Sequence, residues 1–264
     1  MSAASGYEIT AVRYGAAEST KSELFYRYRA YGEPDARQDM DFFFYVLTGG
    51  GETILIDTGF RPELAERRRR ITRAAPLDAL ARLGIEPATV SRVVITHFHW
   101  DHIGNVEHFP QAELYAPARE LHFWAQSLAR NIQFWAHVDP DGVASLLEAA
   151  AAGRVIATGD ELVAPGLRVV TVGGHSPGQQ VLVVETAAGT VALGSDAAHL
   201  YEELELERPF EVVVDLEEMC SAYRMLKRMR DEDGVTVVPG HDPLVCERFA
   251  SLGGDVEEIA FRIA

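Results

Sequence analysis

The sequence predicts a single α/β domain over residues 1–264, with sheets packed together and helices on their outer faces. Strand-like apolar segments recur along the whole chain, and single helical segments separate groups of them. No low-complexity linker divides the chain. A chain of 264 residues can bury enough apolar surface for a stable core without disulfides. Together these observations favour one layered domain.

Apolar and β-branched runs bounded by glycine, proline or polar residues indicate the strands. Residues Gly49–Gly51 lie between two such runs and predict a hairpin turn, and Gly189 predicts the turn of a later hairpin. Strands or strand-rich segments are expected at 7–15, 41–50, 52–60, 90–97, 112–118, 154–175, 181–196 and 235–243.

Four segments have helical character. Residues 62–84 are expected to form one helix. Residues 215–234 carry the clearest amphipathic pattern, with Asp215 as the N-cap. The other two helices are expected at 118–130 and at 141–152, the second with Asp141 near its start.

The charge balance limits the classes of partner. The formal net charge is −16, and an acidic surface repels phosphate backbones, which argues against nucleic acid. The basic run Arg67–Arg70 follows Glu63 and Glu66 at helical spacing, so it is interpreted as a solvated helix face.

Three features indicate a cytoplasmic protein without a membrane anchor. The chain has no run of 18 or more apolar residues that could span a bilayer. The N-terminal residues MSAASGYEIT lack the basic and apolar regions of a secretory signal. Cys220 and Cys246 do not form a C-x-x-C pair, and two buried free thiols are the simplest interpretation.

Four potential metal ligands lie within six residues, in VVITHFHWDHIGN. The apolar run predicts a strand, and His97 and His99 follow it two residues apart, so both can point to one side. Asp101 and His102 come after a turn and can face a second point nearby. This segment therefore suits two metals. Imidazole and carboxylate together suit zinc, iron, manganese or cobalt.

Three more candidate ligands each follow a predicted strand in a glycine-containing loop. They are His175 in VGGHSPG, Asp196 in LGSDAA and His241 in VPGHDP. Glycine permits the sharp turns that bring such a ligand close to a metal. Five histidines and two aspartates are enough for two divalent metals that share one carboxylate.

These motifs resemble those of the metallo-β-lactamase superfamily, over residues 41–243. The residues that carry the resemblance are Asp57 in LIDTG, the H-x-H-x-D-H segment, and the GGHSPG, GSDAA and PGHD motifs. The resemblance implies a four-layer αβ/βα sandwich. It implies that Asp57 supports the ligand loop. The implied ligands are His97, His99 and His175 for the first metal, Asp101, His102 and His241 for the second, and Asp196 as the bridge.

Within that superfamily the chain is most similar to the dinuclear N-acyl homoserine lactonases. The similarity implies a hydrolase with two metals, zinc first among them, that opens a small lactone or ester by attack of a metal-bridging hydroxide on the carbonyl. It also implies a quorum-quenching role. Asp101 is placed by resemblance to assist the leaving alkoxide. A tyrosine commonly follows the bridging aspartate by three residues in those lactonases and contacts the substrate carbonyl. Here that position is His199, with Tyr201 two residues further, so either is a candidate donor.

Other functions fit the same motifs. A thioesterase of the glyoxalase II type shares all seven ligands, and a non-haem iron oxygenase or oxidase is a redox alternative. A non-catalytic binding protein is a further alternative, and the complete set of metal ligands argues against it. No G-x-S-x-G elbow or phosphate-binding P-loop is present.

The substrate pocket is less readable from the sequence. Segment 121–138 carries Phe123, Trp124, Phe134 and Trp135, which either pack the helix onto the domain or line an apolar pocket. Segment 23–32 is interpreted as a lid or a dimer contact, so a homodimer is an expectation. Trp100 is expected to face away from the metals and to form a wall of the pocket.

Overall fold

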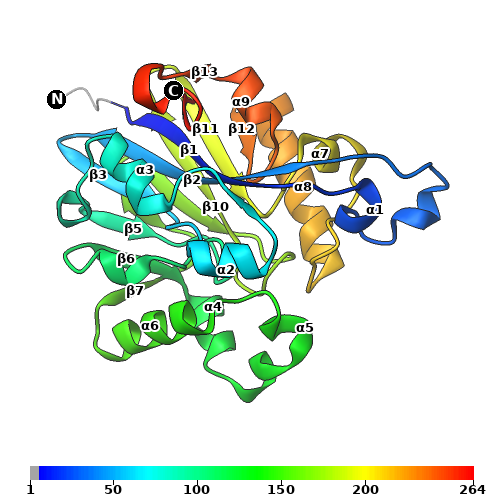
Figure 1. The fold of residues 1–264 in the computed structure, drawn as a ribbon, viewed down its shortest axis with the longest axis horizontal. Helices are drawn as coiled ribbons and strands as arrows, with labels where there is room; N and C mark the ends of the chain where they lie inside the picture. The colour runs from blue at the N-terminus through cyan, green and yellow to red at the C-terminus, as the bar shows by residue number, and fades with distance from the viewer. Residues whose placement is uncertain (1–5) are drawn as a thin grey trace.

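Two β-sheets stacked face to face form the centre of the protein in the computed structural model, which describes residues 6–264 (Figure 1). The first sheet has the order β13-β14-β1-β2-β3-β5-β6-β7, with β4 paired to β1. Its strands are β1 (Glu8–Ala17), β2 (Met40–Gly49), β3 (Glu52–Ile56), β4 (Ile71–Thr72), β5 (Arg92–Val94), β6 (Glu113–Pro117), β7 (Val155–Thr158), β13 (Ala250–Ser251) and β14 (Ala260–Arg262).

The second sheet has the order β12-β11-β10-β9-β8. Its strands are β8 (Leu162–Ala164), β9 (Leu167–Thr171), β10 (Gln180–Thr186), β11 (Gly189–Ser195) and β12 (Thr236–Pro239). Neighbours pair in parallel from β3 through β5 and β6 to β7, and from β11 to β12. The carboxyl ends of parallel neighbours meet at one edge of a sheet, and this edge carries the site described below.

The predicted hairpin turn between β2 and β3 is confirmed. Gly49 pairs with Glu52, which leaves Gly50 and Gly51 as a two-residue turn with φ of 60° and 84°. Such turns need positive φ at both central positions, where glycine pays no steric penalty.

Alternate side chains of the strands build two hydrophobic layers. Phe43, Tyr45 and Leu47 of β2 pack between the sheets with residues of β9, β10 and β11. Phe42, Phe44 and Val46, which alternate with them along β2, face the helices on the outer side. A strand that is buried on both faces has a nearly continuous apolar sequence, and the sequence of β2 shows this pattern.

Helices cover the outer faces of both sheets, which confirms the four-layer αβ/βα arrangement. Figure 1 shows α4, α5 and α6 at the lower end of the molecule and α7 and α8 on its right-hand side, above α5. The helices are α1 (Lys21–Leu24), α2 (Pro62–Arg67), α3 (Pro76–Arg82), α4 (Ala118–Trp124), α5 (Ile132–Trp135), α6 (Pro140–Ala151), α7 (Tyr201–Leu206), α8 (Leu216–Asp231) and α9 (Leu244–Arg248). Asp215 caps α8 as predicted, because its side chain accepts from Glu218 N.

The single helix expected over 62–84 is wrong. The chain leaves α2 at Arg68, turns through Arg69 with φ of 55°, and forms the short strand β4 against β1 before α3 begins. Pro76 opens α3, and the residue before a proline is biased away from helical backbone, as Ala75 is here with ψ of 139°. Two short helices therefore replace one long one.

Smaller differences concern helix ends and the C-terminal segment. The helix expected over 118–130 ends at Trp124, and a separate 3₁₀ turn follows at Ser127–Arg130. Asp141 lies in the first turn of α6 as expected, and the helix begins one residue before it at Pro140, with Asp139 as the N-cap. Helix α9 and strands β13 and β14 are too short to give a sequence signal.

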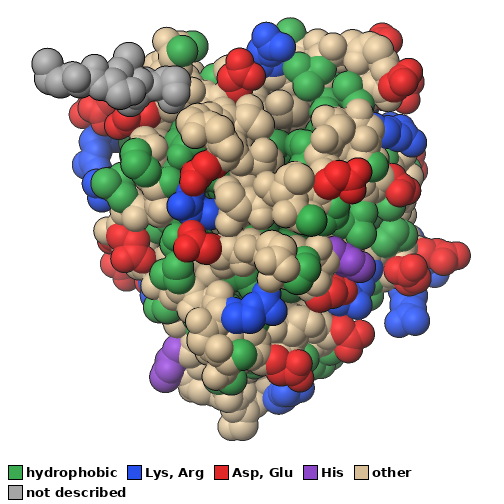
Figure 2. All heavy atoms as spheres, turned by 90° about the vertical axis from the view of Figure 1, so that its left-hand side faces the viewer, with side chains coloured by type: hydrophobic (Ala, Val, Ile, Leu, Met, Phe, Trp, Pro, Cys, Tyr) green, Lys and Arg blue, Asp and Glu red, His purple; other side chains and the backbone are tan. Residues whose placement is uncertain are grey.

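Acidic and basic side chains are interspersed on the face that Figure 2 presents. Among the helices of residues 6–264, none is both long and apolar enough to cross a bilayer. Cys220 and Cys246 are free thiols, and both are only partly buried.

Candidate metal centre

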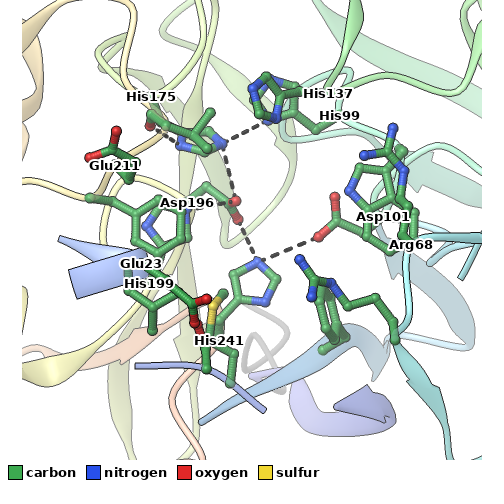
Figure 3. Close-up of a pocket in the computed structure, with 18 of the residues that line it drawn as sticks. Glu23, Arg68, His99, Asp101, His137, His175, Asp196, His199, Glu211 and His241 are labelled. Atoms are coloured by element: carbon green, nitrogen blue, oxygen red, sulfur yellow. Dashed lines mark hydrogen bonds and ion pairs between the residues drawn. The ribbon is translucent and has the colours of Figure 1, made fainter. Parts of the chain in front are cut away.

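The seven predicted metal ligands meet at one place, although they come from four separate loops. His97, His99, Asp101 and His102 follow β5, His175 follows β9, Asp196 follows β11 and His241 follows β12. All seven side chains are buried. Figure 3 shows Asp196 at the centre of this group, between His175 and His241. The loops at the carboxyl ends of these strands therefore converge, as the sequence pattern predicts.

The first subgroup contains His97, His99, His175 and Asp196, whose candidate ligand atoms all lie within 4.8 Å of one another. Nδ1 of His99 lies 2.7 Å from Nε2 of His175, and Oδ2 of Asp196 lies 3.2 Å from the same Nε2. The Nε2 atom of His97 lies 3.8 Å from Asp196 Oδ2. Three imidazoles thus converge on one carboxylate oxygen.

The second subgroup contains Asp101, His102 and His241, whose candidate ligand atoms also lie within 4.8 Å of one another. Oδ1 of Asp196 lies 3.2 Å from Nε2 of His102 and 3.1 Å from Nε2 of His241. Oδ2 of Asp101 lies 3.8 Å from the same atom of His241. The two oxygens of Asp196 therefore face the two subgroups separately, which is the arrangement a bridging carboxylate requires.

The outward nitrogens of three histidines are held by acceptors. Nδ1 of His102 lies 2.7 Å from Oδ2 of Asp57, and the Nδ1 atoms of His175 and His241 each lie 2.9 Å from a backbone carbonyl oxygen. Because these acceptors take the N–H, each Nε2 turns a lone pair inward. The Nε2 atoms of His97 and His102 are buried and, among the described residues, have no hydrogen-bond partner. This donor set fits divalent metal ions.

The electrostatics favour the metal-binding protonation state of three histidines and of Asp196, whereas Asp196, Asp57 and Asp101 raise the pKa of His102 well above its usual range. Burial, together with neighbouring imidazoles, holds the pKa of His97, His99 and His175 well below the usual histidine range. Burial alone would raise the pKa of Asp196, but His241 and the other surrounding imidazoles hold that pKa well below its usual range. Neutral imidazoles around an ionised carboxylate are the species that ligate metals.

Asp57 supports the ligand loop through three contacts, as the resemblance implies. Its carboxylate accepts from Thr96 N and Thr96 Oγ1, each at 2.8 Å, and from His102. Asp57 itself has φ of 64°, and Ser195, next to Asp196, has φ of 45°. Left-handed backbone costs a non-glycine residue roughly 1–2 kcal/mol. Strained residues thus lie at the ends of β3 and β11, beside the cluster.

Glu120 is a functional residue that the sequence reasoning missed. It lies fully buried on α4, and its carboxylate accepts from Phe98 N at 3.1 Å, Ser176 Oγ at 2.9 Å, Gly178 N and Trp124 Nε1. Burial raises the pKa of Glu120, and these donors oppose that shift by stabilising the charged form. One carboxylate therefore ties the loop of His97 and His99 to the loop of His175. An acidic residue on an apolar helix face was the available signal.

A cavity of about 380 Å³ opens onto the cluster. The cluster residues that line it are His99, Asp101, His175, Asp196 and His241, together with His199. The other polar residues of its lining are Glu18, Ser19, Glu23, Arg68, Arg70, His137 and Glu211, and the apolar ones are Leu24, Met40, Phe42, Trp100, Phe210 and Val212. In Figure 3, Arg68 lies on the side of Asp101, and Glu23 and Glu211 lie on the side of His199.

Arg68 corrects the interpretation of Arg67–Arg70 as a solvated helix face. Its side chain is half-buried and lines the cavity, with the guanidinium 4.9 Å from the ring centroid of Trp100. One Nη atom donates to the carbonyl oxygen of Ala136 at 2.7 Å. Burial lowers the pKa of Arg68. Arg68 Nε has no hydrogen-bond partner among the described residues, so a cation with an unused donor lines the cavity beside Asp101.

Trp100 forms a wall of the cavity, as predicted. Its ring stacks on Phe60 at 5.2 Å between centroids and contacts Phe42 edge-on.

The two candidate substrate donors separate in space. His199 lies at the floor of the cavity with Nε2 3.1 Å from Oδ2 of Asp196. Tyr201 turns into the core between the sheets, with the guanidinium of Arg248 3.6 Å from its ring centroid. Tyr201 is therefore not placed to reach a substrate at Asp196, and that prediction is corrected. Residues 199 and 201 lie on either side of the N-cap of α7, Leu200, and point in different directions, which the spacing alone did not indicate.

The aromatic segment 121–138 serves both predicted purposes. Trp124 is buried beside Glu120, and Phe123 packs edge-on against Phe134. Trp124 and Phe134 also line a side cavity of about 220 Å³ that shares His99 and His137 with the main one.

Segment 23–32 packs beside the site. Phe25 is buried and forms a β-bridge with Phe210, while Glu23 and Leu24 line the main cavity. The segment thus contributes a wall, in the position that a lid would occupy.

Comparisons with known proteins support the same family. A profile of the metallo-beta-lactamase superfamily matches residues 43–241. An N-acyl homoserine lactonase of a Bacillus species is 26% identical over 232 residues, covering 79% of this chain and 84% of that protein. Its counterpart from Bacillus thuringiensis is 27% identical over 214 residues, covering 75% and 80%.

Solved structures agree in fold. A quorum-quenching N-acyl homoserine lactone lactonase superposes with a TM-score of 0.75 at 23% identity, covering 90% of this chain and 93% of that one. A hydrolase described as AbOPH in the beta-lactamase superfamily gives a TM-score of 0.69 at 19% identity, covering 98% and 97%. At these sequence identities the structural similarity establishes the fold. It does not identify the substrate, which has to be inferred from the residues of the site.

Removal of divalent metal should destabilise the protein. Without a cation, buried lone pairs and two carboxylates face one another, and a ligand at about 1,000 times its Kd adds about 4 kcal/mol of stability. Dialysis against a chelator is expected to lower the Tm on the order of 10 °C, and added zinc should restore it. Scanning fluorimetry would measure this. An unchanged Tm after complete chelation would refute a metal centre here.

Glu120→Gln should weaken metal binding without touching a ligand. The amide nitrogen of glutamine is a donor and would face donors, so the two loops lose part of their connection. The affinity for zinc is expected to fall about 10-fold to 100-fold in a chelator competition assay. Glu217→Gln, the same change on the exposed face of α8, is the control. Equal affinity in both variants would contradict the role of Glu120.

Proposed function

This chain belongs to the metallo-β-lactamase superfamily, and we propose from its site that it is a dinuclear metal hydrolase that opens a lactone or a similar small cyclic ester. One observation carries the proposal: two subgroups of ligands share Asp196 at the floor of a substrate-sized cavity. The relatives named N-acyl homoserine lactonase support the substrate class.

Two divalent ions would be held by the subgroups described above, with Asp196 between them. The chemistry that such ions supply when bound is Lewis acidity toward a carbonyl and a lower pKa of water, about 7 instead of about 15.7. Zinc is the proposed metal because the imidazole-rich donor set suits it, and iron, manganese and cobalt are the alternatives.

Lactone opening adds the oxygen of water to the acyl carbon, breaks the ring C–O bond and requires a proton for the departing alkoxide. The carboxylate of Asp101 lines the cavity, so it can carry that proton. Its backbone carbonyl accepts from Tyr14 Oη at 2.6 Å, which fixes the position of the residue. We assign proton transfer to Asp101.

The cavity walls would orient the substrate. Trp100 and Phe42 present an apolar wall that keeps water from one side of the ring. Arg68 offers an unused donor on the side of Asp101, where an amide or ester oxygen of the substrate can accept. The side cavity beside Trp124 and Phe134 provides space for an apolar substituent.

A substrate panel tests the function. Metal-loaded protein is expected to open N-acyl homoserine lactones or simpler γ- and δ-lactones, measured as acid release, and Asp196→Asn should abolish turnover because the shared carboxylate loses its charge. Asp233→Asn, an exposed position, is the matched control and should retain activity. Turnover of thioesters alone would favour the thioesterase alternative, and oxygen consumption would favour the redox one. No turnover of any ester, lactone or thioester would overturn the proposal.

Arg68→Gln should impair substrate binding more than the chemical step. Loss of a charge-assisted hydrogen bond of about 1.5–3 kcal/mol predicts a rise in KM of roughly 10-fold to 100-fold with a small change in kcat. Arg67→Gln, one residue earlier and exposed, is the control. Steady-state kinetics on the best lactone of the panel would measure both. An unchanged KM would show that the guanidinium does not contact the substrate.

A further inference from the structure

His199 is the histidine at the floor of the cavity that is not among the seven ligands named by the resemblance. Its side chain is 1% exposed, and Nε2 lies 3.1 Å from Oδ2 of Asp196. The same oxygen faces His175 and His97, whereas Oδ1 faces the second subgroup. His199 therefore approaches the cluster on the side of the first subgroup.

The other ring nitrogen of His199 faces a carboxylate. Nδ1 lies 3.4 Å from Glu203, and the backbone N–H of His199 donates to Glu203 Oε2 at 3.2 Å. Glu203 is fully buried and also accepts from Tyr223 Oη at 2.9 Å and Leu200 N at 3.2 Å. Glu203 therefore holds Nδ1 of His199 and orients the ring so that Nε2 points into the site.

The ring is held in this orientation from two further directions. The ring of Phe210 stacks on it at 3.6 Å between centroids and 12° between planes. The carbonyl oxygen of His199 accepts from His241 N at 2.9 Å, which joins its loop to the loop of a predicted ligand. Nε2 is buried and has no hydrogen-bond partner among the described residues.

This arrangement repeats the one found around His102, whose Nδ1 contacts the carboxylate of Asp57 while Nε2 faces Asp196. Nε2 of His199 thus stands in the same geometric relation to Asp196 as Nε2 of a ligand that the resemblance names. We propose that His199 is an additional ligand of the metal at His97, His99, His175 and Asp196, and that Glu203 is its positioning residue. The inference rests on the dinuclear centre of the proposed function.

The inference changes the role of this position in the reaction. A histidine that ligates through Nε2 has no N–H to offer a substrate carbonyl, in contrast to a tyrosine hydroxyl at the same place. It also takes one coordination position on the first metal from water or substrate. Substrate selection by direct hydrogen bonding then depends on the other wall of the cavity, where Arg68 lies.

Cobalt-substituted protein provides a test that does not depend on activity. Each cobalt-bound imidazole whose other nitrogen carries a proton gives a strongly shifted, solvent-exchangeable N–H signal in proton NMR. His199→Ala should lose one such signal and bind the first metal at least 10-fold more weakly in a chelator competition assay. Glu203→Gln should weaken the same site and shift that signal. His137→Ala, which removes a histidine lining the same cavity, should keep both signal and affinity.

The outcomes separate this inference from the proposed function. His199→Tyr keeps an aromatic ring against Phe210 and serves if the alanine variant is unstable in a thermal melt. If His199→Ala or His199→Tyr keeps every shifted signal and binds cobalt within twofold of the unmodified chain, His199 is not a ligand. Two bound cobalt ions per chain in that case would leave the dinuclear centre intact. Fewer than two bound ions in the unmodified chain would instead contradict the proposed function.

Discussion

The carboxylate of Asp196 is the interaction on which the rest of the site depends. It is buried among imidazoles from four loops, and an isolated charge at such depth would be prohibitively costly. The charge is tolerated only where the surrounding groups compensate it, so the loops must meet with little freedom. The two-sheet arrangement satisfies this demand, because it delivers the ends of β5, β9, β11 and β12 to one edge.

A second set of buried carboxylates keeps those loops in place. Asp57 holds the segment after β5, Glu120 ties that segment to the loop of His175, and Glu203 fixes His199. Each accepts several hydrogen bonds, so each charge is stabilised locally. The left-handed backbone of Asp57 shows that the fold accepts strain to keep one of these contacts. Rigidity of the centre therefore comes from residues that never face the substrate.

The sequence was sufficient for the parts of the molecule that depend on local chemistry. Ligand types at dense spacing after strands identified the cluster, and the Gly50-Gly51 turn followed from backbone conformation. Glu120 and Glu203 escaped notice because a glutamate on a short helix looks solvated until tertiary packing buries it. The helical sequence pattern also continues past Arg69. In the structure the helix ends before that residue, because the following segment pairs with β1 as strand β4. The difference between His199 and Tyr201 depends on where α7 begins, which local patterns do not fix.

Apart from Trp100, the cavity walls come from segments other than the ligand loops. Residues around 18–24, 68–70 and 210–212 shape the entrance, while the reactive centre belongs to the strand ends beneath. Most of these wall residues lie on short, partly exposed elements that contribute little to the inter-sheet core. Evolution or an engineer can therefore exchange the entrance segments without disturbing the centre, and related chains can diverge in what they accept while keeping how they react.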